Sequence, residues 1–408
     1  MAYQHINGVR VWGQPDDGAL AQALTCAATG NVVQTLLMAD HHKGYSQPIG
    51  GVVVYDGQIS PSGVGYDIAC GNKAVRTNVL AADIRPKLGT MMDTVARKIS
   101  FGVGRINNEK VDHDLFDDPD WDVYMAVGRM EHRKLKELAQ SQLGTVGSGN
   151  HFVDLFEESA TGRLWIANHF GSRGFGHKTA SGFINLAAGR EFLANAPGEK
   201  MDQPPVLLDL DSELGDMYYR AMKLAGRYAY AGRDYVIRQV LQIIGAEADL
   251  EVHNHHNFAW KETHSGKDVV VVRKGATPSA PGQVGFIGGS MGDISVIVKG
   301  KDTAENRDSY YSTVHGAGRI MSRTQAAGRM NWKTRTRSGG QISALQMLEA
   351  VRNYGVELRG AGTDESPFVY RKLRDVLDAH AETIEVMHEL KPIGVCMAGA
   401  GEFDPYKD

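Results

Sequence analysis

MYYRAMKLAGRYAYAGRDYVIRQVLQII, residues 217–244, is the strongest secondary-structure signal in this chain. Apolar side chains recur along it at close to the 3.6-residue period of an α-helix, among them Met217, Ala221, Leu224, Tyr228, Ile237, Leu241 and Ile244. Asp211 and Ser212 stand just before it, and both residue types commonly cap helix N-termini. The pattern predicts one long amphipathic helix.

The segments around this helix decide the fold class. Alternating or β-branched runs predict strands at residues 33–38, 51–55, 73–77, 151–156, 164–167, 268–273 and 293–298. Helical periodicity predicts further helices at residues 85–99, 129–142, 319–330, 341–354 and 370–390, and the acidic segment 102–120 is expected to be a surface loop. Strands and helices mix without strict β-α-β alternation, which favours an α+β fold over a doubly wound parallel sheet. Because no stretch has the composition of a linker, we expect a single large domain over residues 1–408.

Composition excludes several classes of protein. The chain has 408 residues, 42% hydrophobic and 23% charged, which argues against wholesale disorder. No apolar run reaches the ~18 residues of a transmembrane helix, and residues 1–12 lack the pattern of a secretory signal. Three cysteines cannot build a disulfide framework, so we expect a cytoplasmic protein that does not associate with membranes. The net charge of −4 argues against non-specific coating of nucleic acid but leaves room for a local basic patch.

Clustered histidines and two other ligand types suggest a metal site. Asp67 and Cys70 stand three residues apart in a glycine-rich turn, so a carboxylate and a thiolate can converge on one cation. His151, His169 and the cluster 253–257 add imidazoles at predicted strand boundaries. A lone buried cysteine is more often a small hydrophobe, and a lone histidine a structural residue, but the combination favours metal binding.

The strand period separates the histidines of the last cluster. If residues 253–257 form a strand, His253 and His255 share one face, while Asn254 and His256 share the other. His256 can then bind a metal while His255 does not. A further polar cluster, Asp40-His41-His42-Lys43-Gly44-Tyr45, follows a predicted strand, where loops often present functional groups, although an ordinary exposed turn explains it too.

Two glycine-rich stretches and a basic segment suggest phosphate binding. Gly288-Gly289-Ser290-Met291-Gly292 can offer backbone N–H groups to phosphate oxygens. His315 leads through small residues to Arg319 and Arg323, which we expect on one face at the start of a helix. Residues 309–347 contain no Asp or Glu, but they include Arg319, Arg323, Arg329, Lys333, Arg335 and Arg337. The alternative interpretation is a solvated helix face.

A phosphate-binding loop, a basic segment and a metal site together favour phosphoryl or nucleotidyl transfer. His315 is the best candidate nucleophile, because imidazole can attack phosphorus and its small neighbours let bulky phosphates approach. The residues alone do not identify the substrate.

In these blocks the chain resembles the RtcB family of RNA ligases. The matching blocks follow the family's order over nearly the whole length: Asp40-His41-His42 with Gly44-Tyr45, Pro48-Ile49-Gly50-Gly51, Gly65-Tyr66-Asp67-Ile68-Ala69-Cys70-Gly71, Gly149-Asn150-His151-Phe152, His169-Phe170-Gly171-Ser172-Arg173-Gly174, His255-His256-Asn257, Arg273-Lys274-Gly275-Ala276, Gly289-Ser290-Met291-Gly292 and His315-Gly316-Ala317-Gly318-Arg319. No single block is decisive, but the ordered set is specific. The resemblance implies an α+β architecture with a metal- and nucleotide-binding site in a central cleft.

The resemblance also implies a reaction that uses GTP and two Mn²⁺ ions. It joins RNA ending in a 3′-phosphate or 2′,3′-cyclic phosphate to a 5′-hydroxyl RNA end, as in RNA repair and tRNA splicing. His315 would be guanylylated, GMP would pass to the RNA 3′-phosphate, and the 5′-hydroxyl would attack that activated end.

The resemblance assigns roles to particular residues. The implied metal ligands are Asp67, Cys70, His151, His169 and His256, with Cys70 bridging the two ions. The implied nucleotide-binding residues are Asn150, Phe152, Asn257, Ser290, Ala317, Gly318, Arg319 and Tyr370. We also expect Arg173 and Arg323 to bind RNA or phosphate.

The chain differs from the family pattern near its C-terminus. A lysine that contacts guanine in the family has no counterpart in the stretch 395–399, where Met397 can pack on a base but cannot donate a hydrogen bond; Lys407 is the nearest substitute. Asp154 stands where glutamate is common, and Lys43 where an apolar residue is usual. We therefore expect weaker discrimination between GTP and ATP than is typical of the family.

These differences keep two alternatives open. One is a metal-dependent RNA end-processing phosphodiesterase, and the other is a non-catalytic RNA-end binder. The presence of His315 with the full ligand set argues against the binder. The sequence does not identify an activating protein partner, the RNA substrate or the oligomeric state.

Overall fold

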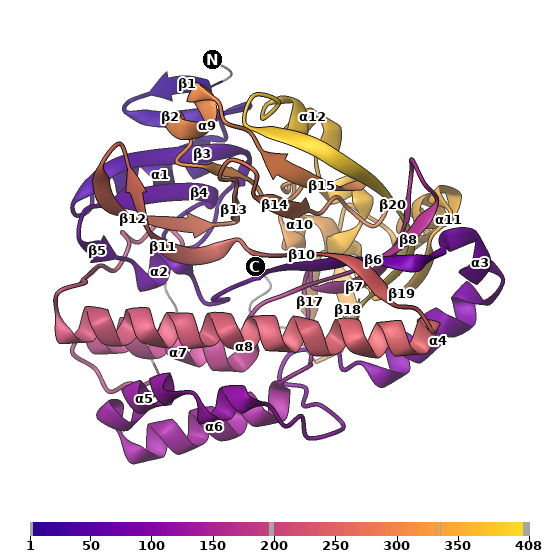
Figure 1. Cartoon of the computed structure of the whole chain (residues 1–408), viewed down its shortest axis with the longest axis horizontal. Helices are drawn as coiled ribbons and strands as arrows, with labels where there is room; N and C mark the ends of the chain where they lie inside the picture. The colour runs from indigo at the N-terminus through magenta and orange to yellow at the C-terminus, as the bar shows by residue number, and fades with distance from the viewer. Residues whose placement is uncertain (1–2, 196–199, 332, 335, 403–408) are drawn as a thin grey trace.

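The computed structural model describes residues 3–195, 200–331, 333–334 and 336–402. Figure 1 shows β-sheets in the upper part of the molecule and a group of long helices packed below them. The α+β class predicted from the sequence is confirmed. Lys407 and Arg335, which the sequence analysis singled out, lie outside the described residues, and the single domain over residues 1–408 stays a prediction.

A six-stranded sheet contains the N-terminal strands. Its strand order is β1 (Tyr3–Ile6), β2 (Val9–Trp12), β3 (Val32–His42), β4 (Ile49–Tyr55), β12 (Lys267–Lys274) and β11 (Asn257–His264). Successive side chains of β4 point to opposite faces, so Val53 packs into one hydrophobic cluster while Val52 and Val54 pack into another. The sheet is therefore buried on both sides of this strand.

The second sheet has eight strands. Its main path is β10 (Ala248–His255), β6 (Gly71–Leu80), β8 (Arg163–Phe170), β7 (Phe152–Glu158), β20 (Ile384–Gly399), β15 (Ser295–Gly300) and β14 (Val284–Ile287), with β19 (Glu357–Ala361) beside β20. Pairing in the two sheets is antiparallel except between β2 and β3 and between β19 and β20. The C-terminal strand β20 pairs with β7, although β7 lies more than 200 residues earlier in the chain.

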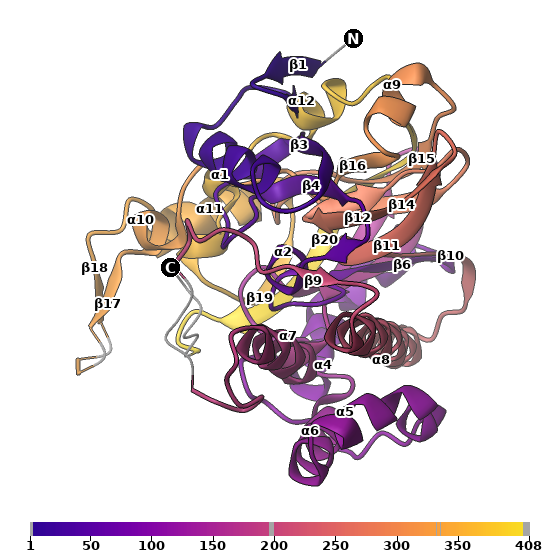
Figure 2. The same ribbon diagram turned by 90° about the vertical axis from the view of Figure 1, so that its left-hand side faces the viewer.

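The long predicted helix is α8 (Glu213–Ile244). Ser212 is its N-cap and accepts a hydrogen bond from the Gly215 N–H, while Gly245 ends it in the left-handed conformation with φ of 76°. α8 contacts β6 and β8 and lies beside α7 (Arg173–Ala187), with α5 (Asp122–Val127) and α6 (Arg129–Gln142) outside them (Figures 1 and 2). The helix therefore supports the strands that carry the histidine motifs.

Shorter elements complete the fold. The remaining α-helices of the described residues are α1 (Asp17–Ala27), α2 (Pro61–Val64), α3 (Ala81–Ile84), α4 (Leu88–Lys98), α9 (Ala304–Asp308), α10 (Arg323–Ala327), α11 (Ala344–Tyr354) and α12 (Leu373–Asp378), and short 3-10 turns lie between some of them. The two-stranded pairs are β13 (Ala276–Pro278) with β16 (Ser312–Val314), β17 (Arg329–Asn331) with β18 (Thr336–Ser338), and β5 (Gln58–Ile59) with β9 (Leu208–Asp209).

Three sequence predictions need correction. The helix predicted at 319–330 shrinks to α10, because Gly328 takes a φ of 79° and β17 begins at the next residue. The helix predicted at 370–390 is the six-residue α12 followed by β20. The segment 102–120 is mostly irregular, but it is not simply a surface loop, since Leu115 and Phe116 are buried in the core.

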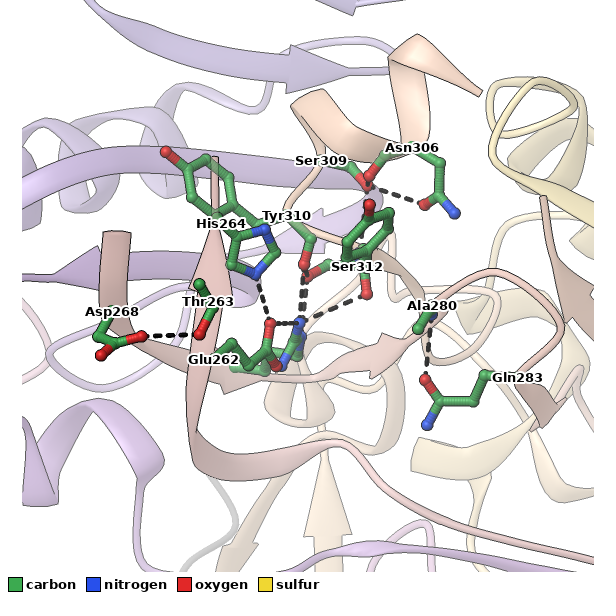
Figure 3. A network of polar contacts seen from close by, with 12 residues as sticks. Glu262, Thr263, His264, Asp268, Ala280, Gln283, Asn306, Ser309, Tyr310 and Ser312 are labelled. Carbon is green, nitrogen blue, oxygen red and sulfur yellow. Dashed lines mark hydrogen bonds and ion pairs between the residues drawn. The ribbon is translucent and has the colours of Figure 1, made fainter. Parts of the chain in front are cut away.

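A polar network fixes β11 and β12 to the segment that follows α9 (Figure 3). Arg273 is 1% exposed and donates to both carboxylate oxygens of Glu262, at 2.6 and 3.2 Å, and to Ser312 Oγ at 2.8 Å. His264 Nε2 lies 2.7 Å from the same carboxylate. This partly buried ion pair, with its additional partners, anchors the end of β12.

None of the helices within the described residues is both long and apolar enough to span a membrane.

Candidate functional site

One cavity of about 850 Å³ lies between strands of the two larger sheets. Its lining includes His42 and Lys274 from the six-stranded sheet and Cys70, Phe152 and His169 from or beside the second sheet. Every residue predicted to be catalytic, metal-binding or nucleotide-binding lines this cavity, and so does Arg323. Arg173 is the one predicted site residue that is not part of the lining.

The turn that carries Asp67 and Cys70 connects α2 to β6. Ala69 in this turn has a φ of 59°, a left-handed conformation that is uncommon for a residue with a Cβ. A Cβ on Gly171 would lie 2.2 Å from Asp67 Oδ1, so only glycine fits beside this carboxylate. The close packing places the turn against the end of β8, next to His169.

Three ligand types converge at this turn. Cys70 Sγ lies 3.7 Å from His151 Nε2 and 3.5 Å from His169 Nε2, and Asp67 Oδ2 lies 3.0 Å from His151 Nε2. The ligand atoms of Cys70, His151 and His169 are all within 4.8 Å of one another. Thiolate, imidazole and carboxylate at this spacing are suited to a divalent transition-metal ion.

The other nitrogens of two imidazoles have hydrogen-bond acceptors. His151 Nδ1 lies 3.0 Å from Val146 O, and His169 Nδ1 lies 2.7 Å from Asn72 Oδ1. The Asn72 acceptor favours the Nδ1–H tautomer of His169, which leaves its Nε2 lone pair directed at the cluster, whereas His151 has an acceptor near each ring nitrogen. Histidines that bind metals in proteins are commonly held in this way.

His255 and His256 have different surroundings, as predicted, although His256 lies in the bend between β10 and β11 rather than within a strand. His255 Nδ1 lies 2.9 Å from Arg233 Nη2, whereas the His256 ring centre lies 5.0 Å from that of His169 and 4.9 Å from that of His315. Nδ1 of His256 is buried and has no hydrogen-bond partner. An unpaired buried nitrogen is costly unless a ligand binds it, so His256 fits the proposed donor set.

Burial sets the protonation states of the cluster. It lowers the pKa of His169 and His256 well below the usual value, so both are neutral, as metal binding requires. It raises the pKa of the Cys70 thiol well above its usual value, so metal binding must displace that proton. Burial also opposes ionisation of Asp67, but the hydrogen bond and charge of His151 and the charge of Arg173 outweigh it and lower the pKa of this carboxyl.

His315 faces this cluster and is held by Asp40. The Asp40 carboxylate is fully buried, and its Oδ2 lies 2.6 Å from His315 Nδ1. The same oxygen accepts the backbone N–H groups of His315 and Gly316 at 3.0 and 3.2 Å. Burial opposes ionisation of Asp40, but these interactions outweigh it and lower its pKa. A role for Asp40 beside His315 was not predicted from the sequence, because nothing local links two residues so distant in the chain.

The two arginines after His315 do not lie free on a helix face. Arg319 Nη1 lies 3.6 Å from Glu365 and the guanidinium lies over the Tyr370 ring, 5.2 Å from its centre. Arg323 contacts Glu365 and also Asp364, the latter at 3.1 Å. These carboxylates are 2–3% exposed, and they come from outside the acid-free segment 309–347. They supply counter-charges that sequence reasoning missed.

Other predicted phosphate contacts are partly engaged within the protein. The Gly289 N–H donates to Ser295 Oγ at 3.0 Å, so this amide of the glycine loop is already bonded. Arg173 has a φ of 56°, and its Nη1 lies 3.3 Å from His151 Nδ1, behind the cavity wall.

The wall formed by β7 and β20 contains two of the three expected differences from the family pattern, at Met397 and Asp154. Met397 pairs with Phe152, and Val395 pairs with Asp154, in the antiparallel register of these strands. Met397 and Asp154 both line the cavity, and Asp154 Oδ1 is buried without a hydrogen-bond partner. Burial raises the pKa of Asp154 well above its usual value.

The family model described as tRNA-splicing ligase RtcB matches residues 22–398. This chain belongs to the RtcB family. It is 31% identical over 450 residues to the tRNA-splicing ligase RtcB of Thermococcus kodakarensis, and the alignment covers 93% of this chain and 91% of that protein. It is also 31% identical over 388 residues to the RNA-splicing ligase RtcB of Escherichia coli strain K12, with 89% of each chain covered.

RtcB family membership confirms the resemblance seen in the sequence and identifies the protein as an RNA ligase. The match spans the Asp67–Cys70 turn, the histidine motifs and His315, and it ends one residue after Met397. The family model therefore covers every residue that lines the cavity except Asp16.

Proposed function

We propose that this RtcB family member is a GTP- and Mn²⁺-dependent ligase that joins RNA 3′-phosphate or 2′,3′-cyclic phosphate ends to 5′-hydroxyl ends through a guanylylated His315. The observation that carries the proposal is the contact between Asp40 and His315 in the cavity that also contains Cys70, His151 and His169. Relatives named as tRNA-splicing and RNA-splicing ligases support RNA as the substrate.

Asp40 prepares His315 for attack on phosphorus. Because Asp40 Oδ2 lies 2.6 Å from Nδ1, it favours the tautomer with the proton on Nδ1, which leaves the lone pair of His315 on Nε2. Nε2 attacks the α-phosphorus of GTP, so a nitrogen–phosphorus bond forms while the bond to the pyrophosphate oxygen breaks. The Asp40 carboxylate stabilises the positive charge that develops on the ring.

The later steps transfer the activated group to RNA. An oxygen of the RNA 3′-phosphate attacks the phosphorus on His315, and the nitrogen–phosphorus bond breaks. A cyclic phosphate end is first opened by water to give the 3′-phosphate. The 5′-hydroxyl oxygen of the second RNA then attacks the activated 3′-phosphate, loses its proton and displaces GMP. Arg319 and Ser290 line the cavity where these phosphates would bind.

The two Mn²⁺ ions would be held by Asp67, Cys70, His151, His169 and His256, which all line the cavity. Bound there, the ions would offset phosphate charge. The cytoplasmic location predicted from the sequence would keep the free thiol of Cys70 reduced and able to act as a ligand.

Labelled GTP tests the proposal. With Mn²⁺, the chain should form an acid-labile GMP adduct that His315→Ala abolishes, and it should ligate RNA bearing a cyclic phosphate to RNA bearing a 5′-hydroxyl. Opening of the cyclic phosphate without an adduct would instead identify an end-processing phosphodiesterase. Binding of RNA ends with neither reaction would identify a binder, and either result would overturn the proposal.

A further inference from the structure

Arg233 lies in the middle of α8 and is fully buried. Its Nη1 donates to Ala69 O at 3.0 Å and to Phe170 O at 2.6 Å. Its Nε donates to His253 Nε2 at 2.9 Å, and its Nη2 lies 2.9 Å from His255 Nδ1. One guanidinium therefore connects the long helix to three other segments of the chain.

Three of these four partners adjoin a proposed metal ligand. Ala69 precedes Cys70, Phe170 follows His169, and His255 precedes His256. The three ligands stand at or next to the ends of β6, β8 and β10, which are neighbouring strands of the second sheet, with Gly71 paired to both His255 and Phe170. Their relative positions depend on contacts between these strand ends, and Arg233 bonds to all three.

We propose that Arg233 is a positioning residue for the metal site, fixing the spacing of Cys70, His169 and His256. The inference rests on the proposed function, because it assumes that these side chains hold the ions. Arg233 does not line the cavity, so it acts through the backbone carbonyls and the imidazole that it bonds.

The turn at Ala69 supports this role. Its left-handed φ of 59° is a strained conformation, which persists only where surrounding contacts hold it. The Ala69 N–H donates to Asn257 O at 2.7 Å, and its carbonyl accepts from Arg233. The Arg233 bond therefore contributes to holding Cys70 in the direction of the histidines.

The partners of Arg233 differ from those of a buried arginine in an ordinary ion pair. No carboxylate is hydrogen-bonded to Arg233 within the described residues, whereas the equally buried Arg273 is paired with Glu262. A positive charge beside a cation site opposes metal binding by itself. The contribution of Arg233 must then come from its planar set of donors, which reach several acceptors at once, rather than from its charge.

Arg233→Lys tests this directly, because lysine keeps the charge but cannot bond to all four acceptors. Mn²⁺ affinity is measured by calorimetry on the full chain, with Co²⁺ as an optical probe whose thiolate charge-transfer band reports the bond to Cys70. We expect Mn²⁺ affinity to fall by about tenfold to a hundredfold and the charge-transfer band to weaken. Arg273→Lys is the matched control for loss of a buried guanidinium, and it should leave both signals unchanged.

The outcomes separate this inference from the proposed function. If the unaltered chain binds Mn²⁺ and the Arg233→Lys protein, folded by circular dichroism, binds it equally well with the same Co²⁺ band, the positioning role is wrong. Equal losses in Arg233→Lys and Arg273→Lys would also overturn it, as would tighter binding by Arg233→Met, which would show that only charge matters. If the unaltered chain binds neither ion, the metal site itself is wrong.

Discussion

Nδ1 of His315 lies 2.6 Å from Oδ2 of Asp40, although 275 residues separate the two in the chain. The carboxylate also accepts the backbone N–H groups of His315 and Gly316, so it fixes both the ring and the turn that carries it. In the proposed mechanism, this contact would leave Nε2 of His315 as the nucleophile.

Asp40→Asn should slow the formation of the GMP adduct by about a hundredfold or more. A neutral amide stabilises the Nδ1–H tautomer of His315, and the positive charge that develops on its ring, less well than a carboxylate does. The rate is measured with labelled GTP under single-turnover conditions. Asp202→Asn removes a carboxylate that pairs with Lys43 at the surface and should leave the rate unchanged. An adduct that forms at the normal rate in Asp40→Asn would exclude this role for the carboxylate.

Cys70→Ala should lose most of the bound Mn²⁺, since it removes the thiolate around which the imidazoles converge. The metal content after gel filtration measures the effect. Cys26→Ala, which alters a buried cysteine on α1, is the matched control and should retain its metal. Equal metal in the two variants would show that the assigned ligand set is wrong.

Metal affinity should rise with pH through the neutral range. Burial raises the pKa of the Cys70 thiol well above its usual value, so protons compete with the ion until the thiol ionises. The neutral state of His169 and His256 contributes little to this dependence, because burial lowers the pKa of both well below the usual value. Mn²⁺ titrations between about pH 6 and 8 should show tighter binding at the higher pH, with a shallower dependence in Cys70→Ala. An affinity that is flat across this range would mean that no thiol proton is displaced.

Glu365→Gln should make RNA binding more sensitive to salt. The substitution removes a carboxylate shared by Arg319 and Arg323, so both guanidiniums gain freedom to bind phosphates. A plot of the logarithm of RNA affinity against the logarithm of salt concentration has a negative slope. Each additional phosphate contact should make this slope steeper by about 0.7 for single-stranded RNA. Glu349→Gln on α11 changes net charge equally and should leave the slope unchanged. Identical slopes in the two variants would mean that these arginines do not bind RNA phosphates.

Met397→Lys should increase the preference for GTP over ATP. Met397 lines the cavity beside Phe152 and cannot donate a hydrogen bond to guanine O6, whereas a lysine can. A buried polar group left unpaired costs about 1–3 kcal/mol, so the ratio of adduct formation with the two nucleotides should rise roughly tenfold to a hundredfold. Met321→Lys places the same charge elsewhere on the cavity lining and serves as the control. An unchanged ratio in Met397→Lys would show that another group selects the base.

The sequence determined the elements and the chemistry that depend on local patterns. α8 was predictable because its apolar period and its Ser212 cap are set by residues a few positions apart. The shared face of His253 and His255, which both contact Arg233, follows from the two-residue period of a strand. The order of the glycine and histidine motifs was enough to recognise the family, and the candidate ligands could be named from it.

Only the tertiary structure decided which distant groups meet. Asp40 faces His315, Arg233 bonds the three strand ends, and Asp364 and Glu365 offset the charge of Arg319 and Arg323. The segment 370–390 has no strong local preference that excludes a helix, yet most of its second half belongs to β20, whose hydrogen bonds go to β7 and β15. A strand gains its stability from partners elsewhere in the chain, and a buried charge gains its counter-charge in the same way, so neither leaves a signal in the neighbouring sequence.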